Sequence, residues 1–342
     1  KQPDILLLPD DLVVKQSSRL LEIPYETYPE RTLRDTFVPI SDIFRTSKGV
    51  VGFPLVVDPM VMYYNRTLFG NQNIVNPPKT WEELEADNLL LTKRDAESNI
   101  LESGVAMGAY DNIKNAKDML ALLILQGGDP IVARNQEGGF VATLGVKNKN
   151  IIRSADNALL YYTSFSNPNN TEKYSWNASM RPDRDLFVAG KLAVYFGFAS
   201  ELFSIQNQNP NLDFDLATMP QIKDTARQLT FGHGYAVSIV KDSPKQAVSY
   251  QVIGLLTNTT FSAKVATLLN TPPPRRDLLV TIPTAYYASI FYKSALLARS
   301  WFDPADSFSS QLFRQMVTDV VSGRSNPTDA VLSANAILTN IF

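Results

Sequence analysis

The chain contains no cysteine and only one histidine, His233. The absence of cysteine excludes disulfides, thiolate nucleophiles and cysteine-ligated metals. A lone histidine without an H-E-x-x-H pattern gives no basis for a zinc site, and no G-x-S-x-G elbow accompanies it. A Walker loop and a G-x-G-x-x-G fingerprint are also missing from the sequence. We therefore expect neither a metal ion nor a cofactor.

Charge of one sign and long apolar runs are also scarce. The 32 basic and 34 acidic residues leave a net charge of −2, which gives no global attraction for nucleic acid or for an anionic membrane. No stretch reaches the ~20 apolar residues that a membrane helix needs. The 342 residues exceed the size of roughly 250–300 at which a single core stops growing, so two lobes are expected.

Strand-like and helix-like segments alternate along the chain, which indicates an α/β fold. "PDILLLPDD" (3–11) is typical of a short, buried, parallel strand that ends in two acids, and "VVGFPLVVD" (50–58) of a second strand. "PPKTWEELEAD" (77–87) predicts a helix start, because Thr80 and Glu83 have the spacing of a capping box. "FGHGYAVSIV" (231–240) predicts a strand entered through glycines.

Carboxylates are the only catalytic chemistry that remains open. Asp10 and Asp11 are adjacent, so in a strand their side chains point to opposite faces and make a poor acid–base pair. Asp58 could instead pair with Asp11 across a cleft, as in a glycoside hydrolase. Acids at strand ends are more often binding or capping groups, so this enzyme hypothesis ranks second.

Several motifs, in order, resemble the extracellular solute-binding proteins that serve ABC importers, in the carbohydrate-binding branch that includes maltose-binding protein. They cover essentially the whole chain: "PDILLLPDD", "GFPLVVDPMVMYYNRTLF", "PPKTWEEL", "FVAGKLAVYFGFASELF", "FGHGYAVSIVKDSPKQAVSYQVIGLLT" and "VVSGRSNPTDAVLSAN". The resemblance implies a two-lobe α/β fold with three interlobe crossovers and a ligand cleft between the lobes. It also implies a protein without catalysis, which captures a sugar or oligosaccharide by lobe closure and delivers it to an ABC transporter permease.

The same resemblance sets the expected organisation. Lobe one is expected at 1–57 with 236–282, and lobe two at 59–232 with 283–342. We expect a monomer without nucleic-acid partners, located outside the cytoplasm in the periplasm or as a cell-surface lipoprotein. A receptor-coupled ligand sensor is the alternative within the same fold.

The front of the family's lobe one has no counterpart here, since "PDILLLPDD" comes almost first. We therefore expect a natural protein with a secretion signal and a further strand-helix-strand unit before Lys1. Lobe one should then look less complete than lobe two.

Asp58 and Pro59 interrupt a run that is otherwise apolar from Gly49 to Phe69. In the family, this is where the chain passes between lobes at the floor of the cleft. An acid there can be satisfied by a sugar hydroxyl or by water. Alternatively, Asp58 caps a helix that starts at Pro59, and the two interpretations are compatible.

Four further cleft residues follow from position in the family pattern. Asp11 stands where the family has a carboxylate that takes sugar hydroxyls, although a surface acid is the alternative. Phe198 and Ser200 inherit the cleft turn, where sugar binders often carry Gly-Pro-Trp and this chain has Gly-Phe-Ala-Ser. His233, between two glycines on the return crossover, is expected as an uncharged donor and acceptor for hydroxyls, or as a hinge-packing residue.

Aromatic side chains complete the predicted ligand-binding set. Trp301 near the third crossover could stack on a sugar face or cover the core, and Trp176 lies in a polar segment that favours a cleft position. Tyr64 could contact either the ligand or the hinge. Trp81, at a helix start, is predicted to pack in the core instead.

Overall fold

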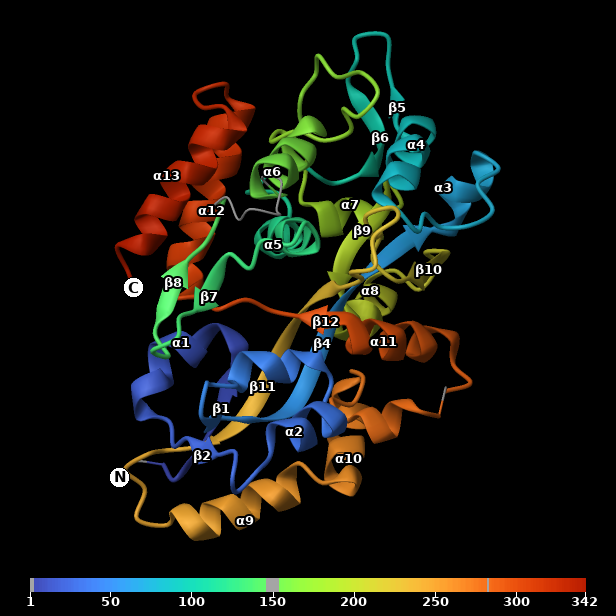
Figure 1. Ribbon diagram of the computed structural model, residues 1–342. Coiled ribbons are helices and arrows are strands. Elements are labelled where there is room, and N and C mark those ends of the chain that lie inside the picture. Colours follow the sequence, from blue (N-terminus) through green and yellow to red (C-terminus); the bar gives the residue numbers. More distant parts are fainter. Residues whose placement is uncertain (1–2, 146–153, 282) are drawn as a thin grey trace.

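The computed structural model describes residues 3–145, 154–281 and 283–342, which form two lobes joined by long strands (Figure 1). Strands β4 (Phe53–Asn65) and β11 (Thr230–Ile239) run through both lobes. Strand β12 (Ala298–Arg299) pairs with the upper end of β11 in parallel and makes the third connection. Helix α11 (Tyr286–Leu297) leads into this connection.

The lower lobe of Figure 1 holds an edge strand, a small ribbon, short helices and two longer helices. Its elements are β1 (Ile5–Pro9), η1 (Asp10–Leu12), α1 (Val13–Gln16), η2 (Ser17–Arg19), β2 (Ile23–Pro24), α2 (Glu30–Thr36), η3 (Pro39–Phe44), β3 (Gly49–Val50), α9 (Gln246–Leu256), α10 (Thr259–Leu269) and η5 (Arg276–Leu279).

The upper lobe is larger and more helical. Its elements are α3 (Arg66–Asn71), α4 (Trp81–Leu91), β5 (Lys93–Arg94), β6 (Ile100–Val105), α5 (Ala116–Gln126), β7 (Val132–Arg134), β8 (Phe140–Ala142), α6 (Ser154–Ser164), α7 (Asp183–Val188), β9 (Leu192–Phe198), η4 (Ala199–Glu201), α8 (Leu202–Gln208), β10 (Phe214–Ala217), α12 (Asp306–Val321) and α13 (Pro327–Thr339).

One sheet path, β1-β11-β4-β9-β6-β5, links the two lobes. Strand β4 pairs with β11 as far as Pro59 and then with β9 from Met60 onward, so it exchanges partners at the hinge. Pro59 fits there because a residue without an N–H is tolerated where the ladder changes. The chain stays extended through Pro59, so the predicted helix starting at that residue is wrong.

The first strand differs from its sequence prediction. Strand β1 is antiparallel to β11 rather than parallel, and within the described residues only its β11 side has a strand partner. Only Leu8 of this strand is buried, whereas Leu7 is 58% exposed. A continuous apolar run was therefore a misleading sign of a central strand, because this one lies at the edge of the path.

Packing of the core is uneven between the lobes. One large hydrophobic cluster fills the upper lobe, and three smaller hydrophobic clusters form the core of the lower lobe and of the hinge. Trp81 is buried in the large cluster, as predicted, at the start of α4, where the capping box between Thr80 and Glu83 is formed. Helix α11 supplies Phe291 to the large cluster and Ala295 to a hinge cluster, so it bridges the lobes.

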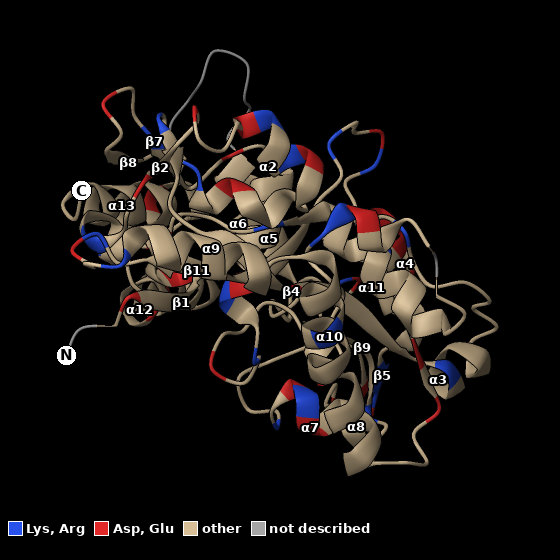
Figure 2. Cartoon of the chain, turned by 90° about the horizontal axis from the view of Figure 1, so that it is seen from below, with Lys and Arg blue, Asp and Glu red and all other residues tan. Residues whose placement is uncertain are grey.

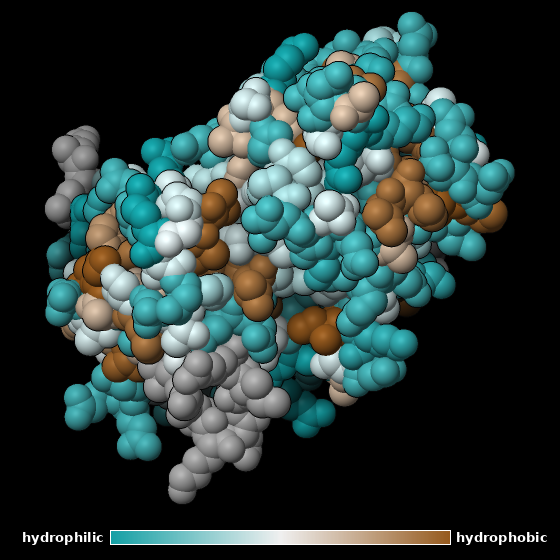
Figure 3. Space-filling model, turned by 90° about the horizontal axis from the view of Figure 1, so that it is seen from above, coloured by the Kyte–Doolittle hydropathy of each residue, from teal (hydrophilic) through white to brown (hydrophobic). Residues whose placement is uncertain are grey.

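The surface carries its charges unevenly. In Figure 2, α9 and α10 are tan, the colour of uncharged residues, over most of their length. Their sequences together contain one charged residue, Lys264 of α10. Across the parts of the chain that the structure describes, no single helix would span a membrane. Only the pair α9 and α10, bent by 63°, passes by length and composition. From above, hydrophobic residues gather in small separate patches on the face shown (Figure 3).

Gly234 allows β11 to pack closely on the hinge. A Cβ at this position would lie 2.6 Å from Cγ1 of Ile40, whereas a Cβ at Gly254 in α9 would meet nothing within 4 Å. We expect Gly234→Ala to lower the free energy of unfolding by about 1–3 kcal/mol through overpacking. Gly254→Ala should raise it by about 0.4–1 kcal/mol, because alanine restricts the unfolded chain. Urea denaturation of both variants checks this, and equal effects would contradict it.

Candidate functional site

The hinge brings polar side chains from distant segments to one level. Asp58 on β4 and His233 on β11 are paired in register. Glycines flank His233 on both sides, and a Cβ at Gly232 would lie 2.9 Å from the Cβ of Ala298 on β12. The two glycines therefore let neighbouring segments approach the strand while His233 itself keeps about a third of its side chain exposed.

Asp10 at the start of η1 is the most buried acid of this hinge, with 2% of its surface exposed. Its carboxylate accepts hydrogen bonds from the backbone N–H of Gly234 (3.0 Å) and from the hydroxyl of Ser300, and lies 3.3 Å from Nδ1 of His233. Burial acts to raise the pKa of Asp10, but the charge of His233 and these hydrogen bonds hold it below its usual value. Asp10, directly after β1, is thus joined to β11 and to the segment that follows β12.

His233 lies between two carboxylates. Its Nδ1 faces Asp10, and its Nε2 lies 3.6 Å from Oδ2 of Asp118 in the first turn of α5. Burial acts to lower the pKa of His233, yet the charges of Asp10 and Asp118 raise it well above its usual value. The raised pKa favours the imidazolium form, in which both ring nitrogens carry N–H donors, whereas the sequence led us to expect an uncharged histidine.

Asp58 is held by the turn that follows β9. Ser200 donates to it twice, from its backbone N–H (3.0 Å) and from its hydroxyl (2.6 Å). Burial raises the pKa of Asp58 against these two hydrogen bonds. The ring of Phe198 lies 4.8 Å from that of His233, centroid to centroid, so the turn closes over the histidine.

A cavity of about 370 Å³ adjoins this hinge between α5 and α12. Asp118 and Lys117 contribute to its wall from α5, Arg314 from α12, and Tyr110 from the loop before α5. Lys117 lies 2.9 Å from Asp303, whose carboxylate also accepts from Ser309. Oδ1 of Asp118 is buried without a hydrogen-bond partner among the described residues. Asp118 thus lines the cavity with a carboxylate of which one oxygen, with almost no exposed surface, lacks a hydrogen-bond partner among the described residues.

Asp11 lies beside the same group of charges. Burial raises its pKa, and the nearby charges of Asp10, Asp303 and Asp306 add to this, while His233 opposes it. Its Oδ1, like that of Asp118, is buried without a partner within the described part of the chain. Two carboxylate oxygens in this region thus lack donors, and a ligand rich in hydroxyl or other donor groups would supply them.

The sequence model of the bacterial extracellular solute-binding proteins matches residues 18–260. The chain belongs to this family.

Individual relatives and solved structures also resemble this solute-binding protein. A protein of Brucella abortus (strain 2308), named as a candidate binding protein, is 23% identical over 213 residues, which are 62% of this chain and 48% of the relative. The chain thus spans about half the length of the curated relatives it matches. The structure of an extracellular solute-binding protein from Staphylococcus aureus in complex with maltose matches with a TM-score of 0.74 at 17% identity, covering 100% of this chain and 84% of that one.

Two further structures resemble the whole chain. A cyclo/maltodextrin-binding protein complexed with maltotetraose gives a TM-score of 0.75 at 17% identity, covering 99% of this chain and 83% of that one. A solute-binding protein from Thermotoga lettingae bound with α-D-tagatose gives 0.70 at 20% identity, covering 100% and 86%. These likenesses show that the expected two-lobe α/β fold is correct.

Membership in a family of binding proteins also bears on the carboxylates. The family comprises solute-binding proteins rather than enzymes, so the expectation of a protein without catalysis is confirmed and the glycoside hydrolase hypothesis is not. Asp58 is engaged by Ser200, and Asp11 borders Asp10 and His233. In this solute-binding protein both acids are better read as part of the polar hinge.

Both predicted tryptophans are buried. Trp176 has no exposed surface, and its Nε1 donates to Oδ1 of Asn112 at 3.0 Å. Trp301 is 3% exposed and stacks on Phe313 with the ring centroids 5.8 Å apart. Neither indole offers a face to a ligand, so the structure contradicts their placement in the cleft. Trp301 instead covers the core, the alternative left open by the sequence.

Tyr64 also lies away from the hinge. Its ring packs on Phe69 at 5.2 Å, and burial raises its pKa to about 12. Six residues of β4 separate it from Asp58, which at roughly 3.3 Å per residue is about 20 Å. The structure therefore joins Asp11, Asp58, Ser200 and His233, with Phe198 beside them, and leaves Tyr64 outside the group.

Sequence reasoning missed four residues that the site uses: Asp10, Asp118, Ser300 and Tyr110. Asp10 was set aside because adjacent residues of a strand face opposite ways, but the strand ends at Pro9 and Asp10 begins a 3₁₀ turn. Asp118 lies in a largely apolar helix, whose sequence gives no sign that its first turn meets β11. The pairing "PDD" was the only available signal for Asp10.

Because the pKa of His233 is raised in the folded protein, we expect the free energy of unfolding to depend on pH. A pKa raised in the folded state contributes stability that is fully present below the unfolded value of ~6.5 and is lost as the pH rises through the folded pKa. The free energy of unfolding should therefore fall between pH 7 and pH 9.5 more steeply in the native protein than in His233→Gln. Urea denaturation at several pH values measures both slopes, and parallel curves would refute the imidazolium bridge.

Proposed function

We propose that this protein captures a sugar or oligosaccharide between its lobes, closes on it and delivers it to an ABC transporter permease. The unsatisfied buried carboxylate of Asp118, in the wall of the cavity beside the hinge, is the observation that carries the proposal. A carbohydrate is favoured because the similar structures contain carbohydrates, namely maltotetraose, maltose and α-D-tagatose. The permease partner follows from the family description and from the transporter named with the Thermotoga protein.

Asp118 suits a sugar hydroxyl because one of its two carboxylate oxygens has no donor among the described residues. Its nearest charged partner is His233 at 3.6 Å, which is too long for a good hydrogen bond, and its Oδ1 has no partner among the described residues. A buried acceptor left without a donor is costly, since buried polar groups are normally satisfied. A ligand hydroxyl in the adjoining cavity would restore the missing hydrogen bond.

Tyr110 supplies the aromatic surface of the same cavity. The guanidinium of Arg314 lies 5.8 Å from its ring centroid, and Asp111 holds that guanidinium at 2.8 Å. Burial raises the pKa of Tyr110 to about 12, so its hydroxyl stays protonated and can donate. A sugar ring stacked on Tyr110 would gain dispersion as well as a hydrogen bond, in place of the tryptophans first expected.

The two lobes approach each other at one contact that closure would change. The hairpin β7–β8 of the upper lobe extends toward the lower lobe beside α1 (Figure 1). A Cβ at Gly138, in the turn of this hairpin, would lie 3.9 Å from the hydroxyl of Ser47, which follows η3. A ligand that touches both lobes binds the closed arrangement better and so shifts the population toward it. We place this capture outside the cytoplasm, in the periplasm or at the cell surface on a lipid anchor.

We expect at least one sugar in a panel of mono- and oligosaccharides to raise the melting temperature. Ligand at 100 times Kd stabilises by ~2.7 kcal/mol, which thermal unfolding detects readily. Asp118→Asn keeps the size of the side chain but removes its charge, and should weaken binding by about 10-fold or more, as expected for a hydrogen bond to a charged group. Isothermal titration calorimetry gives the affinities.

Tyrosine variants separate the ring from the hydroxyl at position 110. Tyr110→Phe keeps the ring and should lose only the hydrogen bond, about 0.5–1.5 kcal/mol. Tyr110→Ala should in addition lose the stacking, about 1–3 kcal/mol, the range for aromatic platforms. Glu97→Gln, an exposed acid of the upper lobe, is the control. Tight sugar binding that ignores both Asp118 and Tyr110 would move the ligand to another site, and no binding by any sugar would refute the ligand class.

Lobe closure can be followed with two pyrene labels, because the chain has no cysteine of its own. Ser47→Cys and Glu137→Cys introduce one label on each side of the contact, and both native residues are exposed. The identified sugar should raise the excimer-to-monomer ratio, and Asp118→Asn should shift this response to a higher sugar concentration. An unchanged ratio at saturating sugar would show that binding occurs without closure at this contact.

A further inference from the structure

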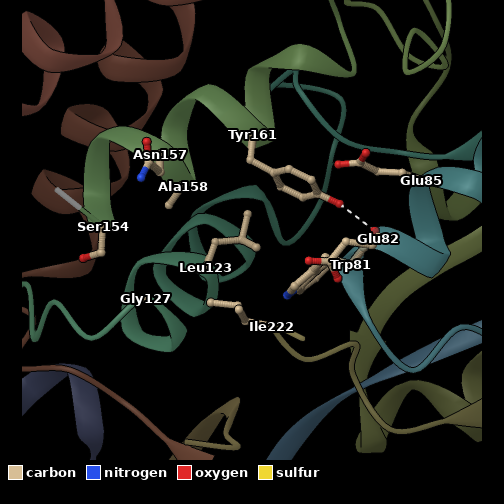
Figure 4. A pocket seen from close by; sticks show the side chains of 10 residues that line it. All are labelled: Trp81, Glu82, Glu85, Leu123, Gly127, Ser154, Asn157, Ala158, Tyr161 and Ile222. Carbon is tan, nitrogen blue, oxygen red and sulfur yellow. Dashed lines mark hydrogen bonds between the residues drawn. The ribbon is translucent and has the colours of Figure 1, made fainter. Parts of the chain in front are cut away.

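A second cavity lies on the other end of α5. Its volume is about 340 Å³, and it opens between the start of α4, the last turns of α5 and the first half of α6 (Figure 4). Leu123 and Gly127 border it, whereas Lys117 and Asp118 border the hinge cavity. Asp118 and Gly127 are nine residues apart, so at 1.5 Å per residue about 14 Å of helix separates the two cavities. None of the described residues lines both.

The wall of this cavity combines an apolar floor with acids. Trp81, Leu123, Ala158 and Ile222 supply apolar surface, and Tyr161 projects toward the acids from α6 (Figure 4). Of the ten described lining residues, two are acids, Glu82 and Glu85, and none is a base. The cavity is therefore negative at one rim and apolar beneath it.

Polar groups of the floor are already engaged. Nε1 of Trp81 donates to Oε1 of Gln126 at 2.6 Å, and the hydroxyl of Tyr161 donates to the carbonyl of Trp81 at 3.2 Å. The floor thus keeps few donors for an anionic ligand. Glu82 is exposed, and it has no ion-pair partner among the residues that the structure describes, so its carboxylate is available as an acceptor.

The chain itself shows that this rim holds an ammonium group. Nζ of Lys173 lies 5.1 Å from the ring centroid of Tyr161 and 2.7 Å from Oε1 of Glu85. Ring and carboxylate together form the usual setting of a cation–π contact. Both Glu85 and Glu82 raise the pKa of Tyr161 beyond the effect of burial, so both carboxylates act on the ring. Lys173 uses one carboxylate of the pair, and Glu82 is left for a second cation.

From this geometry we propose that the cavity binds a small amphipathic organic cation, an aromatic or alkyl ammonium compound. Its apolar body lies against Trp81, Leu123 and Ala158, and its ammonium group lies at Glu82 beside Tyr161. The site is separate from the sugar site proposed beside the hinge, and no step of the proposed transport function depends on it.

Phenethylammonium tests the proposal, with 2-phenylethanol and 3-phenylpropionate as neutral and anionic counterparts of the same body. The chain has three tryptophans, so an assigned ¹H–¹⁵N spectrum contains three indole signals, of which Trp81 alone borders the cavity. Phenethylammonium should shift the Trp81 indole signal in a saturable way and leave those of Trp176 and Trp301 in place. Raising the salt concentration should weaken the binding, because the carboxylate is exposed.

Variants identify the group that recognises the charge. Glu82→Gln should raise the Kd of phenethylammonium at least threefold, whereas Glu97→Gln, an exposed acid elsewhere in the upper lobe, should leave it unchanged. Asp118→Asn should also leave it unchanged, which separates this site from the sugar site. Equal binding of the alcohol or the acid, a wild-type Kd in Glu82→Gln, or shifts confined to Trp176 or Trp301 would each overturn the proposal.

Discussion

The contact between Asp10 and His233 holds the hinge of this protein together. Asp10 is buried where the first strand ends, and it is tied to β11 by His233 and the N–H of Gly234 and to the third connection by Ser300. A buried carboxylate is tolerable only when it is paired and hydrogen-bonded. The imidazolium supplies the charge, and its other nitrogen faces Asp118 of the upper lobe. Segments far apart in sequence are thus fixed by one charge pair.

Two continuous strands, β4 and β11, connect the two lobes at this contact. Strand β4 pairs with β11 as far as Pro59 and with β9 from Met60 onward, so one strand belongs to both lobes. Glycines on each side of His233 let Ile40 and Ala298 approach the backbone from two neighbouring segments. A larger residue at either position would push one of these segments away. Close backbone packing therefore sets where the lobes meet, and polar side chains occupy that junction.

Helix α5 borders two of the cavities of the upper lobe. Its first turn carries Lys117 and Asp118 to the hinge, and its last turns carry Leu123 and Gly127 to the back of the lobe. The middle of the helix is buried on nearly all sides, so it is a rigid element within the large core. Rigid packed elements move as units, because protein interiors are close-packed. The polar N-terminal end of α5 thus lines the cavity beside the hinge, and its apolar C-terminal end lines the second cavity.

The amino-acid sequence by itself determined the alternation of strands and helices, the capping box at Thr80 and the burial of Trp81, because these depend on neighbours within a few residues. Asp58, Ser200 and His233 were also identified from sequence. Tertiary structure alone decided that Trp176 and Trp301 are buried, since their covering residues, such as Asn112 and Phe313, come from other elements. It also decided the charge of His233, which depends on two acids that are distant in sequence. Local pattern fixes the elements, but burial and pKa depend on contacts that only the folded chain creates.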